Sequence, residues 1–527
     1  MYNKRGALTK ARGSYRRSTM SISEAVARWE VFEVTLTGKE AGNPFMDCTI
    51  EGIFTGERES VRVDGFYDGD GVYRVRFMPS YEGVYHYSVT GSYTDKREPV
   101  TGQFLVLPAK EGNHGPVHVA DTFHFRYADG TPYYSIGTTC YVWELESDER
   151  IAQTLHSLAQ AGFNKIRFCI FPKHYDYNFK EPRSYPYAGT PMDNSVLTED
   201  NFWDYTQNPR ENNSWDFARF NPAHFRHIEG CIEQLGKLGI EADLILFHPY
   251  DRWGFSKMSR EEDDLYVRYV AARFAAFHNV WWSLANEYDL LEKTEADWDR
   301  FGGILCGKDP YGHLRSIHNC IPFYDYTRPW VTHCSIQRQD IYKTVEFTNE
   351  WRNTYQKPVV IDEMAYEGNI PHFWGNITAQ EMVRRFWECA MRGGYPGHGE
   401  TYLSEDNVLW WSHGGELRGE SWKRFRFLYD ILCETPGLGL TSDASLDYNG
   451  VTAVPQDETE RANKSYFIYY YSFMQPAFKK FTLEDRYEAE IIDTWNMTID
   501  KAGVFQGTFR IELPGRPYMA IRLKKVQ

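Results

Sequence analysis

The feature that most constrains the fold is a regular alternation that begins near Pro132, where short apolar runs are separated by amphipathic helical segments. Helix starts are predicted by two capping boxes and one cap followed by proline: Ser259 with Glu262, Thr378 with Glu381, and Asn221 with Pro222. Eight strand–helix alternations over roughly 300 residues predict a (β/α)8 barrel rather than an open sheet. The predicted strands are Tyr133–Thr138, Lys165–Ile170, Glu241–Phe247, Val280–Ala285, Arg315–His318, Trp330–Cys334, Pro358–Ile361 and one within Gly394–Trp411.

Two of these strands end at a glutamate. The run Val280–Ala285 leads into Asn286 and Glu287, and the run Pro358–Ile361 leads into Asp362 and Glu363. An unpaired buried charge is costly, so a carboxylate at the tip of a core strand indicates a need for it there. Because the carboxyl ends of barrel strands face one pocket, we expect the two glutamates to meet, as glycosidic bond cleavage requires. Successive side chains of a strand point to opposite faces, so Asp362 is predicted to point away from the pocket and to support the site rather than attack the substrate.

Other polar and aromatic residues near strand ends are predicted to bind substrate. A guanidinium inside a barrel strand, as at Arg167, needs an anion nearby, and the amide of Asn286 could bind a sugar hydroxyl. Several of these residues also have a structural alternative. Arg167 could form an ion pair at the bottom of the barrel, and His248 could be a hydrogen-bonded histidine at a strand end. Glu400 could be a turn residue, and the two tryptophans could pack in the core. The predicted binding set is Arg167, His248, Asn286, His318, His333, Glu400, Trp410 and Trp411.

No metal or organic cofactor is predicted. His318 and His333 lie on different runs without H-x-H or H-E-x-x-H spacing, so hydrogen bonding is favoured over metal ligation. No G-x-G-x-x-G or G-K-[ST] follows the early strands, and no G-x-S-x-G nucleophile elbow occurs. Nine scattered cysteines without a C-x-x-C pair favour reduced thiols and a cytoplasmic location.

The composition narrows the partners. A formal charge of −15 argues against nucleic acid and anionic membranes, and no run approaches the ~20 apolar residues of a membrane span. Aromatic residues make up 16%, which suits either stacking on sugar faces or a tyrosine-rich β-core. Residues 1–20 carry six basic side chains without an apolar stretch, so a solvated basic tail is predicted rather than a secretory signal.

The barrel is predicted to lie between two β-domains. In residues 21–110, Tyr73, Val75 and Phe77 alternate with polar residues, as do Tyr85 and its neighbours, which predicts an immunoglobulin-like β-sandwich. A cluster of breakers around Pro436 marks the end of a catalytic domain at 111–435, and alternation resumes in 436–527, a second small β-sandwich. These flanking domains could pack on the barrel, bind sugar or form a homo-oligomer.

A long segment between Pro172 and Asn221 carries many aromatic residues. Loops of this length in compact domains are usually functional, so we interpret it as a wall that narrows the cleft and favours short or terminal glycans. Its aromatic residues are Tyr175, Tyr177, Tyr185, Tyr187, Phe202, Trp203, Tyr205 and Trp215.

With these motifs the chain resembles the clan A glycoside hydrolases, which are retaining enzymes on (β/α)8 barrels, and within them the bacterial apiosidase-type barrels with a β-sandwich before the barrel. The resemblance covers about 110–435 firmly. It implies that Glu287 is the general acid/base and Glu363 the nucleophile. The clan often has a tyrosine after the sixth strand, and the run Thr332–Gln337 has none, so His333 is predicted to replace it.

The predicted function is therefore a glycosidase acting by double displacement, which retains configuration and is expected to release terminal sugars. Its two carboxyl groups should lie about 5–5.5 Å apart. A non-catalytic carbohydrate-binding protein on an old barrel and a transglycosidase are the alternatives, and a metal-dependent hydrolase is a more distant one.

Overall fold

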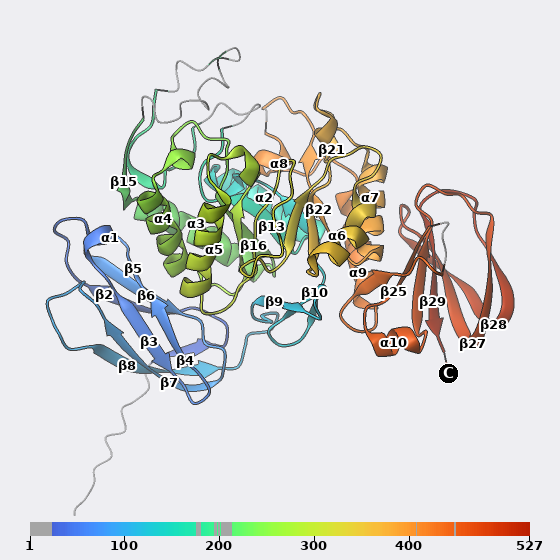
Figure 1. Ribbon diagram of the computed structural model, residues 1–527, viewed down its shortest axis with the longest axis horizontal. Helices are drawn as coiled ribbons and strands as arrows, with labels where there is room; N and C mark the ends of the chain where they lie inside the picture. Colours follow the sequence, from blue (N-terminus) through green and yellow to red (C-terminus); the bar gives the residue numbers. More distant parts are fainter. Residues whose placement is uncertain are drawn as a thin grey trace, which may run out of the picture.

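The computed structural model describes residues 24–174, 181–193, 198, 201, 213–406, 408–446 and 450–526. Three parts follow one another along the long axis of the molecule (Figure 1): a blue β-domain, a central barrel and a red β-domain. This architecture confirms the predicted fold class of a barrel flanked by two β-domains.

Eight parallel strands form the barrel. Hydrogen bonds connect them in the order β18-β17-β16-β13-β12-β22-β20-β19, and an isolated bridge between His318 and Ser335 joins the two ends. All residues of these strands except the half-buried Arg315 are buried, as expected for a closed parallel sheet. Their bounds are β12 (Gly137–Thr139), β13 (Lys165–Cys169), β16 (Glu241–Phe247), β17 (Val280–Ala285), β18 (Arg315–Ser316), β19 (Cys334–Gln337), β20 (Val359–Glu363) and β22 (Tyr395–His398).

Helices surround these strands: α2 (Asp148–Ala161), α3 (Pro222–Lys237), α4 (Arg260–Phe274), α5 (Glu295–Lys308), α6 (Thr348–Tyr355), α7 (Ala379–Met391), α8 (Trp410–His413) and α9 (Phe425–Cys433). The expectation of eight strand–helix alternations is wrong at one place, because no α-helix lies between β18 and β19. That connection contains Pro322, Pro329 and the turn residue Asp325, which break helical periodicity. The predicted capping box of α4 is present, whereas at α7 only the Thr378 half forms and Glu381 pairs with Arg384 and Arg385 instead.

The first β-domain is a sandwich of two sheets. One contains β1 (Ala25–Ala27), β8 (Val100–Leu107), β7 (Gly83–Thr90), β3 (Glu51–Thr55) and β4 (Ser60–Asp64), and the other β2 (Phe32–Thr37), β6 (Val72–Phe77) and β5 (Phe66–Tyr67). Tyr73, Val75 and Phe77 point into the shared core, as their alternation predicted.

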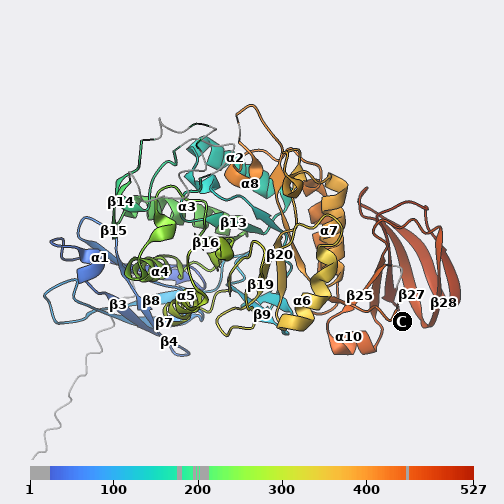
Figure 2. The same cartoon turned by 45° about the horizontal axis from the view of Figure 1, so that its top comes forward.

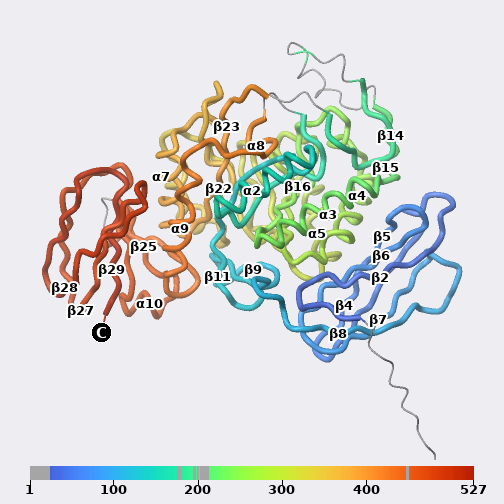
Figure 3. The backbone as a smooth tube through the Cα atoms, turned by 180° about the vertical axis from the view of Figure 1, so that it is seen from behind, coloured from blue at the N-terminus to red at the C-terminus, as the bar shows by residue number. Residues whose placement is uncertain are grey.

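A small sheet closes the amino-terminal end of the barrel. It consists of β9 (Val117–Ala120), β10 (His124–Tyr127) and β11 (Pro132–Tyr133), and it lies below the barrel strands in Figure 3. Phe125 at its centre contacts Trp281, His333 and Tyr395. The predicted strand Tyr133–Thr138 is thus two strands: β11 belongs to this small sheet, and β12 begins the barrel.

The C-terminal domain is one six-stranded antiparallel sheet, ordered β24-β25-β26-β29-β27-β28, rather than two separate sheets. The first half of β27 pairs only with β28. This hairpin folds back over the rest of the sheet, so that Phe481 contacts Tyr469 of β26 in a hydrophobic core that belongs to this domain alone. The face of the sheet opposite this core packs on α7, and α7 lies between the sheet and the barrel strands (Figure 2). The strands are β24 (Leu440–Ser442), β25 (Val451–Pro455), β26 (Tyr466–Tyr470), β27 (Phe478–Asp493), β28 (Thr498–Glu512) and β29 (Met519–Lys525), with α10 (Glu458–Ala462) between β25 and β26.

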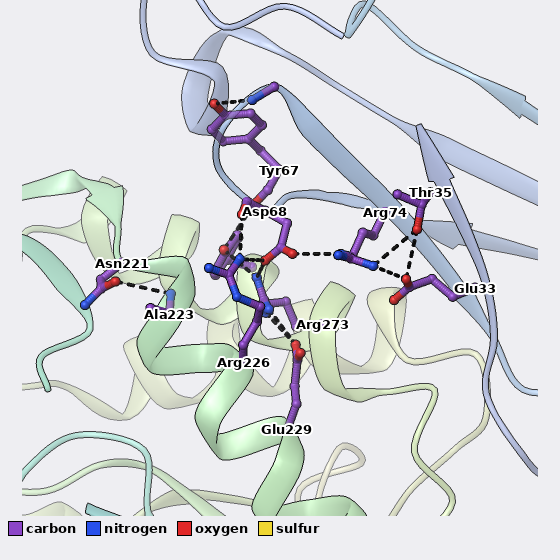
Figure 4. A network of polar contacts seen from close by, with 12 residues as sticks. Glu33, Thr35, Tyr67, Asp68, Arg74, Asn221, Ala223, Arg226, Glu229 and Arg273 are labelled. Carbon is purple, nitrogen blue, oxygen red and sulfur yellow. Dashed lines mark hydrogen bonds and ion pairs between the residues drawn. The ribbon is translucent and has the colours of Figure 1, made fainter. Parts of the chain in front are cut away.

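A buried charge network, centred on Asp68, fixes the first β-domain to the barrel (Figure 4). Asp68 accepts from Arg74 at 2.7 Å and pairs with Arg273 of α4 at 2.8 Å and Arg226 of α3 at 3.0 Å. Burial alone would raise the pKa of Asp68, but Arg273 and Arg74 outweigh it and hold the pKa below its ordinary value.

The same network continues through Glu229 of α3. Its carboxylate accepts from Arg76 at 2.7 and 3.0 Å and from Arg273 at 2.7 Å. Asp68 and Glu229, the two buried carboxylates of this network, therefore each have at least two cationic partners, as buried charges require. In the part of the chain that the structure describes, no helix is long and apolar enough to cross a membrane.

Candidate active site

A cavity of about 640 Å³ opens at the carboxyl ends of the barrel strands. This is the end of a (β/α)8 barrel where active sites lie. Many of the residues lining it come from strand ends or the segments directly after them, among them Tyr141, Tyr250, Asn286, Glu287, Gln337, Glu363 and Tyr366, and Trp411 of α8 joins them. Both glutamates singled out by the sequence thus face one cavity.

Glu287 lies where β17 ends, and its backbone is in the left-handed region, with φ 50° and ψ 59°. This conformation costs a non-glycine residue roughly 1–2 kcal/mol, a strain typical of functional positions. Its carboxylate accepts a hydrogen bond from the Tyr250 hydroxyl and a second from Gln337 Nε2 at 3.2 Å. These contacts hold a strained carboxylate in a fixed orientation at the cavity wall.

Glu363 ends β20 and has cationic as well as neutral partners. Tyr141 donates a hydrogen bond to it, and Arg167 Nη1 and His318 Nε2 each lie 3.3 Å from Oε1. The predicted ion pair of Arg167 with a pocket carboxylate is present.

His318 connects Glu363 to Gln337 and Ser335. Nε2 faces two acceptors, Glu363 Oε1 and Gln337 Oε1, each at 3.3 Å. Nδ1 faces the Ser335 hydroxyl at 3.0 Å, and that hydroxyl donates to Asp362 at 2.6 Å. Both ring nitrogens of His318 therefore face oxygen atoms, Nε2 those of Glu363 and Gln337 and Nδ1 that of Ser335. Asp362 points away from the cavity and also pairs with Lys165 at 2.7 Å, a supporting position.

The surroundings shift the two carboxyl groups in opposite directions. Burial and the charge of Glu363 raise the pKa of Glu287 above its ordinary value, against the lowering effect of Lys173 and Tyr250. Burial would also raise the pKa of Glu363, but His318 and Arg167 outweigh it and lower the pKa. Two carboxyl groups pushed apart in this way can act as a proton donor and an ionised nucleophile.

Lys173 follows β13 and was not among the predicted site residues. Its Nζ lies 3.4 Å from the ring centre of Tyr141 and 4.2 Å from that of Tyr250, the two tyrosines that hold the glutamates. Burial lowers the pKa of Lys173 to about 7. Its charge is thus placed to act on both carboxylates.

Asn286 lines the cavity as predicted. Its Oδ1 lies 3.1 Å from the Tyr141 hydroxyl, while its buried Nδ2 has no hydrogen-bond partner. A buried amide donor left unpaired is costly, and a sugar hydroxyl would satisfy it.

Four predicted binding residues lie elsewhere among the described residues. His333 lies at the opposite end of the barrel, between Phe125 and Trp281, because β19 begins only at Cys334. His248 lies behind the cavity wall near the carbonyl of Phe171, and burial with the charge of Lys173 lowers its pKa to about 3. Trp410 packs on Phe163 and donates to Thr138, so Trp411 is the tryptophan that faces the cavity.

Glu400 is the fourth predicted binding residue that lies away from the cavity. Its carboxylate is buried beneath the loop after α8 and accepts from the amides of Arg418 and Gly419 at 2.6 and 2.7 Å. It does not line the cavity. Glu400 instead belongs to the one group of described residues whose geometry could hold a metal ion, together with Glu367 and His398.

Sequence reasoning missed Tyr141, Tyr250, Gln337 and Lys173. Tyr141 and Gln337 stand at the ends of β12 and β19, and Tyr250 and Lys173 follow β16 and β13 within four residues. The rule that identified the glutamates would also have selected these positions. In addition, His318 takes the role that had been predicted for His333.

The mouth of the cavity is apolar. Ile321 and Phe373 line it, with exposed fractions of 80% and 61%. The rings of His372 and Trp374, which also line the cavity, stack on each other with their centres 5.5 Å apart. Part of the predicted aromatic wall lies outside the described residues, namely Tyr175, Tyr177, Phe202, Trp203 and Tyr205. The described members Tyr185, Tyr187 and Trp215 pack on Trp253 and Phe255 and do not line the cavity.

Comparison with known proteins adds three family matches. Residues 120–428, more than half of the chain, match an apiosidase-like catalytic domain. Residues 25–92 and 456–524 match two domains of unknown function, DUF5060 and DUF5605. No match was found among curated proteins.

Solved structures agree with this match. A crystal structure of a candidate glycoside hydrolase from Bacteroides vulgatus ATCC 8482 is 37% identical, covers 95% of this chain and 100% of its own, and has a TM-score of 0.86. A family 5 glycoside hydrolase from the same organism shares the fold at 14% identity, with a TM-score of 0.58 over 78% of this chain and 93% of its own.

Proposed function

The chain belongs to the apiosidase-like glycosidases, and on this premise we propose that it retains anomeric configuration, cleaving O-glycosidic bonds by double displacement with Glu363 as nucleophile and Glu287 as acid/base. The observation that carries the proposal is that one cavity holds two carboxyl groups whose pKa values are pushed in opposite directions. A retaining glycosidase needs one protonated and one ionised carboxyl group at neutral pH.

In the first step, Glu287 donates its proton to the leaving oxygen while a Glu363 oxygen attacks the anomeric carbon. The bond from that carbon to the leaving oxygen breaks, and the leaving group departs as an alcohol. Contacts with His318 and Arg167 lower the pKa of Glu363 and so keep it ionised before the attack. Tyr141 donates to the same carboxylate and orients it.

In the second step, Glu287, now ionised, accepts a proton from water, and the water oxygen attacks the anomeric carbon. The ester to Glu363 breaks and the sugar leaves with its original configuration. Gln337 and Tyr250 hold Glu287 in one position for both proton transfers. Gln337 also contacts His318, so one chain of hydrogen bonds connects the acid/base to the partner of the nucleophile.

We also propose that the enzyme removes terminal sugars from short glycosides. A cavity of about 640 Å³ has room for a few sugar rings, and Trp411 gives one of its walls an aromatic surface. The unpaired amide of Asn286 supports a hydrogen bond to a hydroxyl of the sugar whose bond is cleaved.

The location and partners follow from simpler observations. All nine cysteines are free, which supports a reducing compartment such as the cytoplasm. The only partner the site calls for is its carbohydrate substrate, and the formal charge of −15 disfavours nucleic acid and anionic membranes. Measuring the molar mass in solution would test whether a flanking β-domain forms a homo-oligomer.

The test is stereochemical. The protein is first screened on a panel of aryl glycosides, and the anomer released from the best substrate is followed by proton NMR before mutarotation. The proposal expects the same anomer as the substrate, and the matching 2-deoxy-2-fluoro glycoside should label Glu363 in a peptide mass map.

An inverted product or a label on another residue would overturn the mechanism. Absence of turnover on every glycoside, together with measurable sugar binding, would favour a carbohydrate-binding protein. Glycoside products that dominate at high acceptor concentration would favour a transglycosidase.

A further inference from the structure

Two buried glutamates stand directly opposite each other behind the cavity wall. Glu367 on β21 (Glu367–Gly368) is the register partner of Glu400 on β23 (Glu400–Thr401) in a parallel pair. Both side chains are almost completely inaccessible to solvent. Like charges directly opposite each other in a sheet are destabilising, so the pair needs compensation.

Backbone amides supply part of that compensation. Four consecutive amides of one loop donate to the two carboxylates: Arg418 and Gly419 to Glu400, and Glu420 and Ser421 to Glu367. A Cβ at Gly419 would lie 2.6 Å from the Glu367 carboxylate, so only glycine permits this approach. Neither carboxylate has an ion-pair partner among the described residues, and the side chain of Arg418 is exposed. Neither of the two buried carboxyl groups thus has a full positive charge within contact distance.

A third side chain completes the group. His398 ends β22, is fully buried, and uses Nδ1 on the Thr138 hydroxyl at 3.0 Å. Its Nε2 has no hydrogen-bond partner. One ligand atom each from His398, Glu367 and Glu400 all lie within 4.8 Å of one another.

We propose that Glu367, His398 and Glu400 bind a divalent first-row transition-metal ion, such as Zn²⁺ or Mn²⁺. One imidazole nitrogen and two carboxylates are a donor set that suits these ions, whereas Ca²⁺ requires six to eight oxygens. Ligand atoms lie ~2.0–2.2 Å from Zn²⁺, so side-chain movements below about 1 Å would complete the site.

The bound ion stabilises the loop that contains Arg418–Ser421 against the end of the barrel. It also lies next to the cavity wall, because Tyr366 precedes Glu367, lines the cavity and packs on Gly399 between two of the ligands. The role is structural and separate from the chemistry of Glu287 and Glu363.

The test measures metal directly. The full chain is purified without metal-affinity chromatography, gel filtered and analysed by inductively coupled plasma mass spectrometry. The proposal expects close to one equivalent of Zn²⁺ or Mn²⁺ per chain. After treatment with EDTA, Tm should fall, and adding Zn²⁺ or Mn²⁺, but not Ca²⁺, should raise it again by at least ~2 °C.

Two variants locate the ion. His398→Gln and Glu400→Gln should each weaken metal binding, measured by isothermal titration of the EDTA-treated protein, by more than ~100-fold, beyond what loss of an outer-shell partner causes. Glu144→Gln is the matched control, because Glu144 is another completely buried glutamate but is not part of this group. It should bind metal as the unaltered chain does.

The unaltered chain decides the question even if the variants fail to fold. Less than ~0.1 equivalent of metal, together with a Tm that none of the ions changes, would overturn the proposal. The two carboxyl groups would then share a proton instead. Since the readouts are metal content and Tm, this outcome leaves the glycosidase proposal unaffected.

Discussion

The molecule buries two groups of charged residues, and they differ in how completely their charges are paired. At the interface between the first β-domain and the barrel, Asp68 and Glu229 each have two or more arginine partners. At the cavity, the amide of Asn286 has no hydrogen-bond partner and Glu287 is held in a strained backbone conformation, and behind Glu363 two guanidinium nitrogens of Arg167 also lack a hydrogen-bond partner.

This difference separates stability from function. A network in which every buried charge has an ion-pair partner has little left to offer a ligand, so its value lies in holding two domains in one arrangement. An incompletely paired site keeps polar groups that a substrate can satisfy, at a cost in stability. The comparison predicts that substitutions in the cavity change activity, whereas substitutions at the interface change the free energy of unfolding.

The largest expected effect is in the cavity. Glu363→Gln removes the proposed nucleophile but keeps its shape, so kcat/KM should fall by more than about 10⁴-fold. Glu287→Ala should lower kcat/KM by about 10²–10⁴-fold on substrates with poor leaving groups and much less on activated aryl glycosides, which do not need the proton. Steady-state kinetics on a matched substrate pair measures both. Wild-type activity of Glu363→Gln on every cleaved glycoside would refute the assignment.

The second effect is at the interface. Asp68→Ala leaves buried arginines without their carboxylate and should lower the free energy of unfolding by about 3–5 kcal/mol, measured in urea, while the folded protein keeps its kcat. Asp216→Ala is the control, because its pair with Arg219 is half exposed and should contribute no more than ~1 kcal/mol. A loss below ~1 kcal/mol for Asp68→Ala would contradict the comparison.

The pH dependence of the interface follows from the same contacts. Since its arginine partners lower the pKa of Asp68 in the folded state, the stabilisation is present above the unfolded pKa of ~3.9. It is lost as the pH falls through the folded value. The Asp68→Ala chain should therefore lose less stability than the unaltered chain between pH 5 and the acid limit, which acid titration of both chains would measure.

The third effect is a shift in the pH profile of activity. The charge of Lys173 lowers the pKa of Glu287, so Lys173→Met should raise that pKa and move the basic limb of kcat/KM to higher pH. Activity at the optimum should fall by less than about 100-fold, because the acid/base itself is intact. Lys173→Arg keeps the charge and should restore the position of the limb. An unmoved limb in Lys173→Met would show that the cation does not act on Glu287.

Much of this molecule could be predicted from its sequence because the decisive signals are local. Apolar runs of four to six residues, such as Pro358–Ile361 before Asp362 and Val280–Ala285 before Asn286, predict buried parallel strands, and a carboxylate at the end of each predicts the cavity. Arg167 followed from the cost of an unpaired guanidinium inside a strand. These inferences need only the strand and its direction.

The rest required the exact strand bounds. The run Trp330–Cys334 is as apolar as a strand, yet the ladder forms over Cys334–Gln337. A strand advances ~3.3 Å per residue, so a shift of three residues moves a side chain by about 10 Å. This shift takes His333 to the bottom of the barrel and places Gln337 beside Glu287. Glu400 was misplaced for a different reason, because the loop that covers it comes from residues 418 and 419, far along the chain.

The smallest expected effect tests that shift. His333 contacts Phe125 and Trp281 at ring distances of 5.8 and 5.3 Å, and burial lowers its pKa to about 3, so it is neutral at any assay pH. His333→Phe keeps the ring and should change kcat/KM by less than ~2-fold, although Tm can change because the site is tightly packed. His318→Phe is the matched variant and should cost about 10²–10³-fold, since it removes a donor to the nucleophile. If His333→Phe lost as much activity as His318→Phe, the sixth strand would have the register that the sequence suggested, and the nucleophile's partners would have to be assigned again.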